Sequence, residues 1–164
     1  MKKFTEAITK SLEEKNWYAG LFLALAIPDI CGSLENPTQK AEKRRYIAWF
    51  DRYLGEKYRR SFSGDDCYYF RCACLHQGLA RHTKMTSQRI HFIEPPSKNV
   101  MVHMNTIKNV LQMQIDRFCQ DICAAVDKWE DDIKNDLEIK KRISGLINIY
   151  PIKTIERLIK FNES

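Results

Sequence analysis

Residues 17–31 read WYAGLFLALAIPDIC, and this stretch decides the fold. The pattern predicts a helix that is apolar nearly all round, and Asn16 can cap its first turn. A helix of this kind belongs in the centre of a group of helices. Because the strongly apolar run from Trp17 to Ile27 is shorter than the roughly 20 residues of a membrane span, we expect a buried helix and no membrane segment.

The segments on either side predict more helices around this centre. Residues 4–14 are charged and amphipathic, and Thr38 can cap a helix that runs to about Tyr58. That helix carries an aromatic stripe at helical spacing, which should face the core. The stripe consists of Tyr46, Trp49, Phe50, Tyr53 and Leu54.

A further helix is bounded by recognisable signals at both ends. Ser63 and Asp66 have the spacing of a capping box, with carboxylates in the first turn, where the helix dipole favours them. Gly78 stands where a left-handed C-terminal cap would fall. Residues between these signals, including Arg71 and His76, are therefore expected on one well-defined helix.

The second half of the chain predicts a small hairpin and a long helix. Residues 89–93 and 100–104 alternate around a Pro-containing turn, so His91 and His103 are expected as cross-strand partners. Asn105 or Thr106 can start a helix with a core stripe of Ile107, Leu111, Phe118, Ile122, Ala125 and Trp129. We expect an all-α fold over residues 1–164, a single domain built as a helical bundle with a minor β-hairpin. Its 164 residues, 44% of them hydrophobic, suffice for one sizeable core.

The positive charge of the chain is concentrated in its first part. The formal net charge is +6; residues 1–104 hold 17 Lys and Arg against 11 Asp and Glu, and residues 105–164 hold 10 of each. A local positive field attracts polyanions without selecting a sequence, although a basic helix face can also be simply solvated. The candidate RNA-binding residues are Arg44, Arg45, Arg52, Arg59, Arg60, Arg81 and His82.

Six cysteines lie mostly in apolar helical patterns, which indicates reduced thiols and a cytoplasmic location. Acidic residues such as Glu6 and Glu13 occupy the region that a signal peptide keeps basic. The group Cys67, Cys72, Cys74 and His76 has the spacing C-x4-C-x-C-x-H within one helix, which does not suit structural zinc. Nucleotide-loop, hydrolase and zinc-protease signatures are absent, so we expect no metal and no cofactor.

Arg71 and His76 are the candidate catalytic residues. Histidine titrates near neutral pH and can move a proton at a ribose hydroxyl, while arginine offers a permanently charged fork for a phosphate. Five residues of helix give roughly 140° of rotation, so the arginine must curl back, or two copies must meet across a two-fold axis. Alternatively, Arg71 pairs with a carboxylate such as Asp66 and His76 is hydrogen-bonded near the helix end.

An R-x4-H motif on a late helix of an all-helical domain resembles the HEPN superfamily (higher eukaryotes and prokaryotes nucleotide-binding). Over roughly residues 17–130 the chain is also similar to a family of uncharacterised bacterial proteins. The blocks that carry this second likeness are GLFLALAIPD (20–29), RYIAWF (45–50), DCYYFR (66–71) with HQG (76–78), and IHFIEP (90–95).

The HEPN resemblance implies a homodimer that brings the Arg and His of both subunits together and cuts RNA without metal, leaving a cyclic phosphate. His76 would be the general acid or base and Arg71 the phosphate clamp, with Asp65, Asp66 and Tyr69 as supporting groups or as a cap and packing residues. A role in bacterial defence or as a toxin, with a protein antitoxin or regulator, is implied by the resemblance alone.

Two departures from the family pattern define the main alternative. Cys72 stands where active members often have a polar residue, and Gly78 stands where some carry a tyrosine. The alternative is a catalytically inactive HEPN-like module that binds RNA, a nucleotide or a protein partner. A purely structural dimerisation domain is a third reading.

Overall fold

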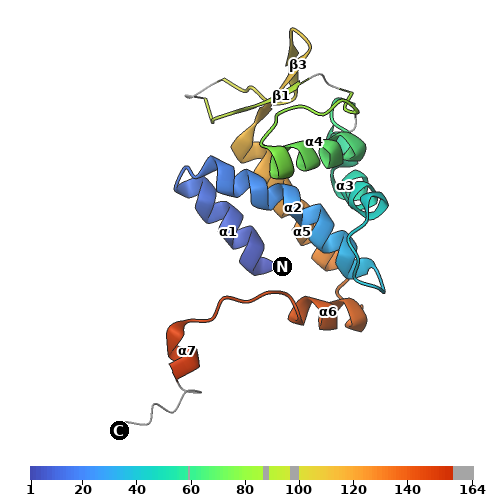
Figure 1. Ribbon diagram of the computed structural model, residues 1–164, viewed down its shortest axis with the longest axis vertical. Helices are drawn as coiled ribbons and strands as arrows, with labels where there is room; N and C mark the ends of the chain where they lie inside the picture. The colour runs from blue at the N-terminus through green and yellow to red at the C-terminus, as the bar shows by residue number, and fades with distance from the viewer. Residues whose placement is uncertain (59, 87–88, 97–99, 157–164) are drawn as a thin grey trace.

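The structure, a computed structural model, describes residues 1–58, 60–86, 89–96 and 100–156. Over these residues the protein is mainly helical, with a small three-stranded sheet at one end of the helices and α6 at the other (Figure 1). The helices are α1 (Lys2–Glu13), α2 (Trp17–Glu35), α3 (Lys43–Tyr58), α4 (Gly64–Gln77), α5 (Ile115–Asp132), α6 (Leu137–Ser144) and α7 (Ile152–Glu156). The strands are β1 (Arg89–Ile93), β2 (Asn105–Ile107) and β3 (Val110–Gln114).

Helix α2 is the centre of the fold, as the sequence predicts. Its first turn is capped by Asn16, whose side-chain oxygen accepts from the Ala19 amide at 3.3 Å. It contacts α1, α3, α4, α5 and α6, and it continues beyond the expected end at Cys31 to Glu35. By length and mean hydropathy (1.4) α2 could cross a membrane, but half of that apolar window is buried inside the protein, and this burial accounts for its composition.

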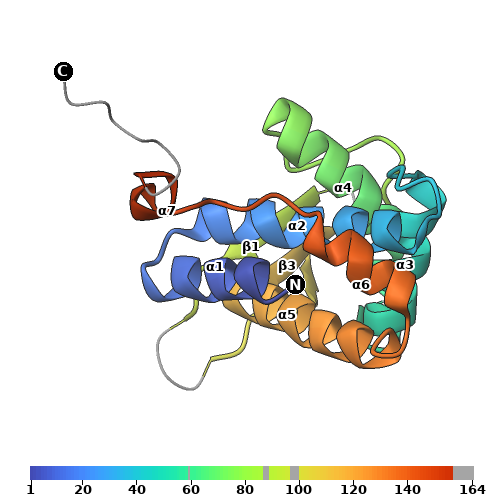
Figure 2. The ribbon, with the colours of Figure 1, turned by 90° about the horizontal axis from the view of Figure 1, so that it is seen from below.

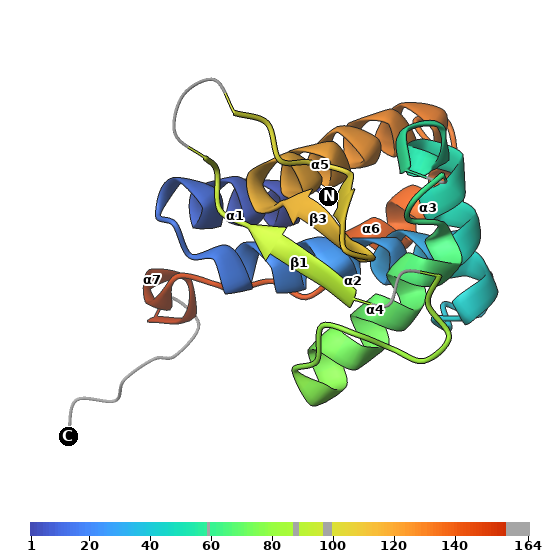
Figure 3. The same ribbon diagram turned by 90° about the horizontal axis from the view of Figure 1, so that it is seen from above.

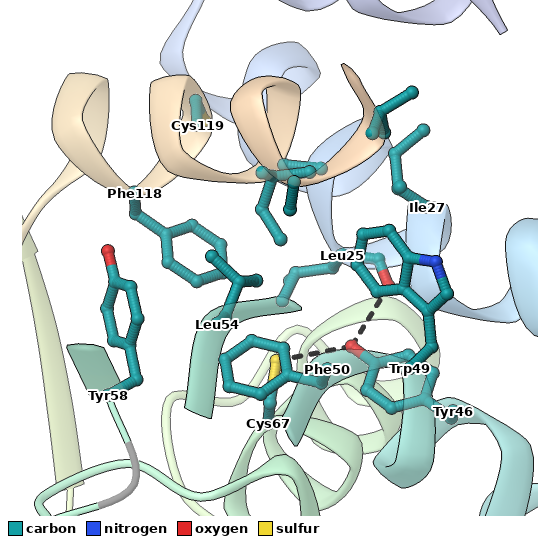
Figure 4. Packing of buried hydrophobic residues seen from close by; sticks show 14 of the residues in the cluster. Leu25, Ile27, Tyr46, Trp49, Phe50, Leu54, Tyr58, Cys67, Phe118 and Cys119 are labelled. Atoms are coloured by element: carbon teal, nitrogen blue, oxygen red, sulfur yellow. Dashed lines mark hydrogen bonds between the residues drawn. The ribbon is translucent and has the colours of Figure 1, made fainter. Parts of the chain in front are cut away.

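The aromatic stripe of α3 faces the core as predicted: four of its five residues are buried, and Tyr53 is half-buried. The Tyr46 hydroxyl donates to the Leu25 carbonyl at 3.1 Å and lies 3.2 Å from the Cys67 sulfur, so one side chain joins α2, α3 and α4 (Figure 4). A methyl group at Gly32 of α2 would lie 3.2 Å from the backbone of Arg45, so glycine there permits the close approach of α2 and α3.

The predicted start of α3 at Thr38 is wrong. Asn36 organises the preceding loop instead: its side-chain oxygen accepts from the Thr38 amide at 3.2 Å and the Thr38 hydroxyl at 3.1 Å, and its amide group donates to the Lys40 carbonyl at 2.9 Å. Because the Thr38 hydroxyl is used inside this loop, it caps no helix, and α3 begins at Lys43.

The predicted pairing of residues 89–93 with 100–104 is also wrong. β1 pairs with β3 in parallel, with Ile90 opposite Leu111, and the hairpin is formed by β2 and β3. Its two turn residues, Lys108 and Asn109, have φ of 49° and 62°, the left-handed values that a type I′ turn requires. β3 is the middle strand (Figure 3) and is buried along most of its length.

The long helix expected from residue 105 starts ten residues later, at Ile115. Ile107 and Leu111 are strand residues of this hairpin: Ile107 faces Val110 and is 56% exposed, whereas Leu111 faces Thr106 and is buried. The remaining members of the predicted stripe are correct. Phe118, Ile122, Ala125 and Trp129 are all buried and join the single cluster of core residues.

His103 ties the loop before β2 to the helices and is not a cross-strand partner of His91, which faces Gln112. Its Nδ1 accepts from the Gln114 amide at 3.2 Å, and its Nε2 lies 3.0 Å from the Tyr58 hydroxyl. That hydroxyl donates to Asp121 at 2.5 Å. The chain of bonds requires a neutral imidazole that carries its proton on Nε2.

This chain of bonds predicts that acid weakens the fold through His103. Burial lowers the pKa of His103 below its ordinary value of 6.5, and Lys57 and Arg117 add to this against the opposing effect of Asp121. The stability that neutral His103 contributes is therefore fully present above pH 6.5. It is lost as the pH falls from 6.5 towards the pKa of His103 in the folded protein, by about 1.4 kcal/mol per unit of difference between the two pKa values. Urea unfolding of wild type and His103→Asn across this range measures it.

The exposed His91 supplies the control. The variant His91→Asn should keep the wild-type pH dependence, whereas His103→Asn should flatten it. Equal pH dependence in wild type and His103→Asn would show that His103 is not the titrating group.

Candidate functional site

The start of α4 is built as the sequence predicts and is docked on α3. Ser63 and Asp66 form the capping box, with reciprocal backbone-to-side-chain bonds of 3.1 and 3.2 Å. The Gly64 amide donates to Asp51 at 2.8 Å. A methyl group at Gly64 would come within 2.8 Å of the Ile47 carbonyl, so glycine permits this contact between the two helices.

The other end of α4 and the loop after it are fixed as well. Gly78 adopts the predicted left-handed conformation, with φ of 67°. The second oxygen of the Asp66 carboxylate accepts from the Thr86 amide at 2.6 Å, which holds the loop against the helix start. Asp66 is thus fully engaged as a cap and a loop anchor, and it is not the partner of Arg71.

Arg71 and His76 converge on α4. The arginine curls back along the helix, so that its Nη1 lies 3.5 Å from the Nε2 of His76. The Arg71 side chain is only 21% exposed, whereas His76 is open to solvent. A half-buried guanidinium therefore lies next to an exposed imidazole.

Asp29 of α2 holds the arginine in this position. Its carboxylate forms an ion pair with Nη2 of Arg71, and the Asp29 side chain is 14% exposed. Burial raises the pKa of the Asp29 carboxyl, and Arg71 offsets part of this rise. For Arg71, burial alone would lower the pKa, but the attraction of Asp29 and the contact with Cys72 raise it overall.

Asp29 was not among the predicted site residues. The available signal was a lone carboxylate on a helix that is otherwise apolar nearly all round, since burying an unpaired charge is costly. Such a residue requires a cation from another element. The sequence alone does not identify that cation as Arg71.

The contact between Arg71 and His76 has chemical consequences. A guanidinium can only donate, so Nε2 accepts only when the imidazole is neutral and protonated on Nδ1. A neutral Nε2 can also accept a proton from a ribose hydroxyl. The remaining Nη1 contacts of Arg71 are long, 3.8 Å to the Cys72 sulfur and 3.5 Å to His76, and a phosphate oxygen could replace them.

Two predicted supporting residues belong to a cation and aromatic cluster beside α4. Lys43 lies 2.7 Å from Asp65 and donates to the Tyr69 hydroxyl at 2.6 Å, and these two bonds raise its pKa to about 12. The Tyr69 ring stacks on His82, with centroids 4.6 Å apart, and Lys84 lies 5.5 Å from the same ring. Asp65 and Tyr69 therefore hold basic groups next to the helix.

Three of the predicted RNA-binding arginines are engaged with carboxylates. Arg44 and Arg45 both contact Glu42, at 2.6 and 3.8 Å. Arg52 lies 3.3 Å from Asp132, near the end of α5. These pairs reduce the positive field of α3, although Arg44 and Arg45 share the single carboxylate of Glu42.

The other predicted basic residues lie near the end of α4 or after α3. Arg60 and Arg81 are exposed, and Arg59 lies outside the described residues. Arg81 and His82 line an open pocket of about 670 Å³. Gln77, the residue after His76, also lines it. The pocket is lined by Gln77, Leu79, Arg81, His82, Thr83 and Met85.

Within the described residues, no group of three or more His, Cys, Asp or Glu could hold a metal ion. Comparisons with protein-family models, curated proteins and solved structures find no match for this chain. The geometry of the site is therefore the basis for a functional proposal.

The ion pair between Asp29 and Arg71 should contribute measurably to the unfolding free energy of the protein. Replacing the carboxylate by its isosteric amide in Asp29→Asn leaves a mostly buried guanidinium without a counter-ion, which should cost about 1–3 kcal/mol of unfolding free energy after allowance for partial exposure. Urea unfolding at neutral pH measures this loss. The control is Glu6→Gln, which breaks the exposed pair of Lys2 and Glu6 and should change little. Equal stability of both variants would contradict a stabilising role for Asp29.

Proposed function

We propose that this protein is a metal-independent endoribonuclease of the HEPN type. The observation that carries the proposal is the convergence of Arg71 and His76, with Nη1 and Nε2 3.5 Å apart at the exposed end of α4. Asp29 supports it by anchoring the guanidinium from α2. In this proposal the packed helices α1 to α5 correspond to the helical bundle of that superfamily.

The chemistry needs only the groups that converge here. His76, as the general base, takes the proton of a ribose 2′-hydroxyl, and the 2′-oxygen attacks the neighbouring phosphorus. The bond from phosphorus to the 5′-oxygen breaks, a proton goes to that leaving oxygen, and a 2′,3′-cyclic phosphate remains. Arg71 stabilises the negative charge that grows on the phosphoryl oxygens.

A homodimer would complete the proposed site. One His76 cannot serve at once as the base for the 2′-hydroxyl and as the acid for the 5′-oxygen, so a second copy across a two-fold axis would supply the second group. The proposal also includes a cytoplasmic location, supported by six free cysteines. A protein antitoxin or regulator is the further partner that this class of enzyme implies.

A second candidate function is a catalytically inactive module of the same kind that binds RNA, a nucleotide or a protein partner. The observation that favours it is the ion pair with Asp29, because a guanidinium with an internal counter-ion binds a phosphate less strongly. Cys72 in place of a polar residue fits this reading as well. The two candidates differ in whether RNA is cut.

Cleavage of RNA in excess chelator tests the first candidate. We expect purified protein to cut a labelled single-stranded RNA and to leave 2′,3′-cyclic phosphate ends, while an all-2′-deoxy strand of the same sequence stays intact. Loss of general acid–base catalysis in His76→Ala should lower the rate by about 10²–10⁴-fold. Arg71→Lys should also lower it, because lysine keeps the charge but loses the planar fork.

Lys140→Ala is the control, since it removes an exposed charged side chain from α6, at the other end of the protein from the sheet. It should cleave at the wild-type rate. Equal cleavage by wild type and His76→Ala would contradict the enzyme, as would complete inhibition by chelator. RNA binding without cleavage, weakened in Arg71→Lys, would support the inactive module instead.

A further inference from the structure

The chain beyond α6 forms an arm whose apolar side chains from Ile147 to Ile152 are exposed to solvent. Residues 146–156 leave the helices and run to α7 along an extended path (Figure 2). The arm exposes four large apolar side chains, of which Ile149 is 97% exposed. The other three are Ile147, Tyr150 and Ile152. A run of exposed apolar residues of this kind marks an interaction surface.

A matching apolar groove lies at the opposite end of the molecule. A pocket of about 390 Å³ opens between α2, the end of α4 and β1, and Tyr18, Phe22 and Leu79 on its margin are 76%, 41% and 47% exposed. A smaller pocket of about 150 Å³ shares Tyr18, Leu21 and Phe92 with it, so the two form one trough. We call this trough the α2–α4–β1 groove.

The arm of the same protein does not occupy this groove. Its first residues are anchored on α1, where the Lys3 amino group donates to the Ile147 carbonyl at 2.5 Å and to the Asn148 side chain at 2.6 Å. Figure 1 shows the arm leaving from the α6 end, while β1 lies at the other end. An arm held in this direction points away from its own groove.

We infer that the arm of each protein packs into the α2–α4–β1 groove of a second copy, in a reciprocal dimer. Charge agrees with this occupant, because the exposed Lys153 of the arm has the opposite sign to Glu94 at the groove margin.

The apolar area is also appropriate. Stable dimers bury about 800 Å² on each partner, and an aromatic side chain buries about 150–250 Å². The exposed aromatic residues Tyr18, Phe22 and Tyr150 would supply a substantial part of that area.

This inference rests on the homodimer in the proposed function and names the surfaces that would form it. The groove includes Cys74 and Gly78, which flank His76 along α4. Because positions two apart on a helix are rotated by about 200°, an arm from the partner would contact the face of α4 that points away from His76. The inference depends on the oligomeric state and does not depend on whether RNA is cut.

Light scattering after gel filtration tests the dimer with full-length variants. Ile149→Asp in the arm and Tyr18→Asp in the groove should each weaken dimerisation at least about tenfold, because each buries a charge at a central contact. Both residues are exposed within one protein, so urea unfolding should match the wild type at a protein concentration low enough for the wild type to be monomeric as well. The control Leu137→Asp alters a side chain that is 77% exposed on α6 and should remain a dimer.

Mixing the two variants tests the reciprocal geometry. A heterodimer of Ile149→Asp with Tyr18→Asp keeps one intact arm and one intact groove, so native mass spectrometry should show more one-to-one dimer than either homodimer. A monomeric wild type would overturn the inference, whether the groove binds its own arm or another protein. A dimer that survives Ile149→Asp would overturn the arm contact while leaving a homodimer in place, and the cleavage assay reports on the enzyme separately.

Discussion

Burial of α2 is the constraint on which the rest of the structure depends. Its apolar surface extends nearly all round the helix, so only contact from several sides can remove it from water, and α1, α3, α4, α5 and α6 provide that contact. Each large side chain such as Leu25 or Ile27 contributes about 1.5–3 kcal/mol when buried. The positions of the surrounding helices follow from this one requirement, and the sheet closes one end of the assembly (Figure 3).

The candidate site inherits its geometry from the same helix. Asp29 lies one residue after Pro28 on α2 and reaches Arg71 on α4. The Tyr46 hydroxyl of α3 contacts the Leu25 carbonyl of α2 and the Cys67 sulfur of α4, and so joins the three helices. Because polar contacts in a core have strict geometry, these bonds fix how α4 sits on α2. The convergence of Arg71 on His76 is thus a consequence of tertiary packing and not of helix periodicity alone.

Local signals in the sequence predicted local structure well. The central helix, the aromatic stripe of α3 and the capped ends of α4 at Ser63 and Gly78 all follow from patterns within a few residues. The sheet was not predicted, because Ile107 and Leu111 have the i, i+4 spacing of a helix face although they lie on two strands, and the parallel partner β1 is distant in sequence. Asp29 was missed for the same reason: pairing with Arg71 depends on how two helices pack.

The ion pair with Asp29 need not compete with a phosphate for the whole arginine. A guanidinium has five N–H donors in a fixed plane, and the carboxylate takes Nη2, while Nη1 faces His76 through a long contact. A phosphate approaching Nη1 therefore arrives next to the imidazole, with Arg71 already held in place. Anchoring of this kind lowers the entropic cost of binding, and it leaves Nη1 of Arg71 facing the exposed imidazole of His76.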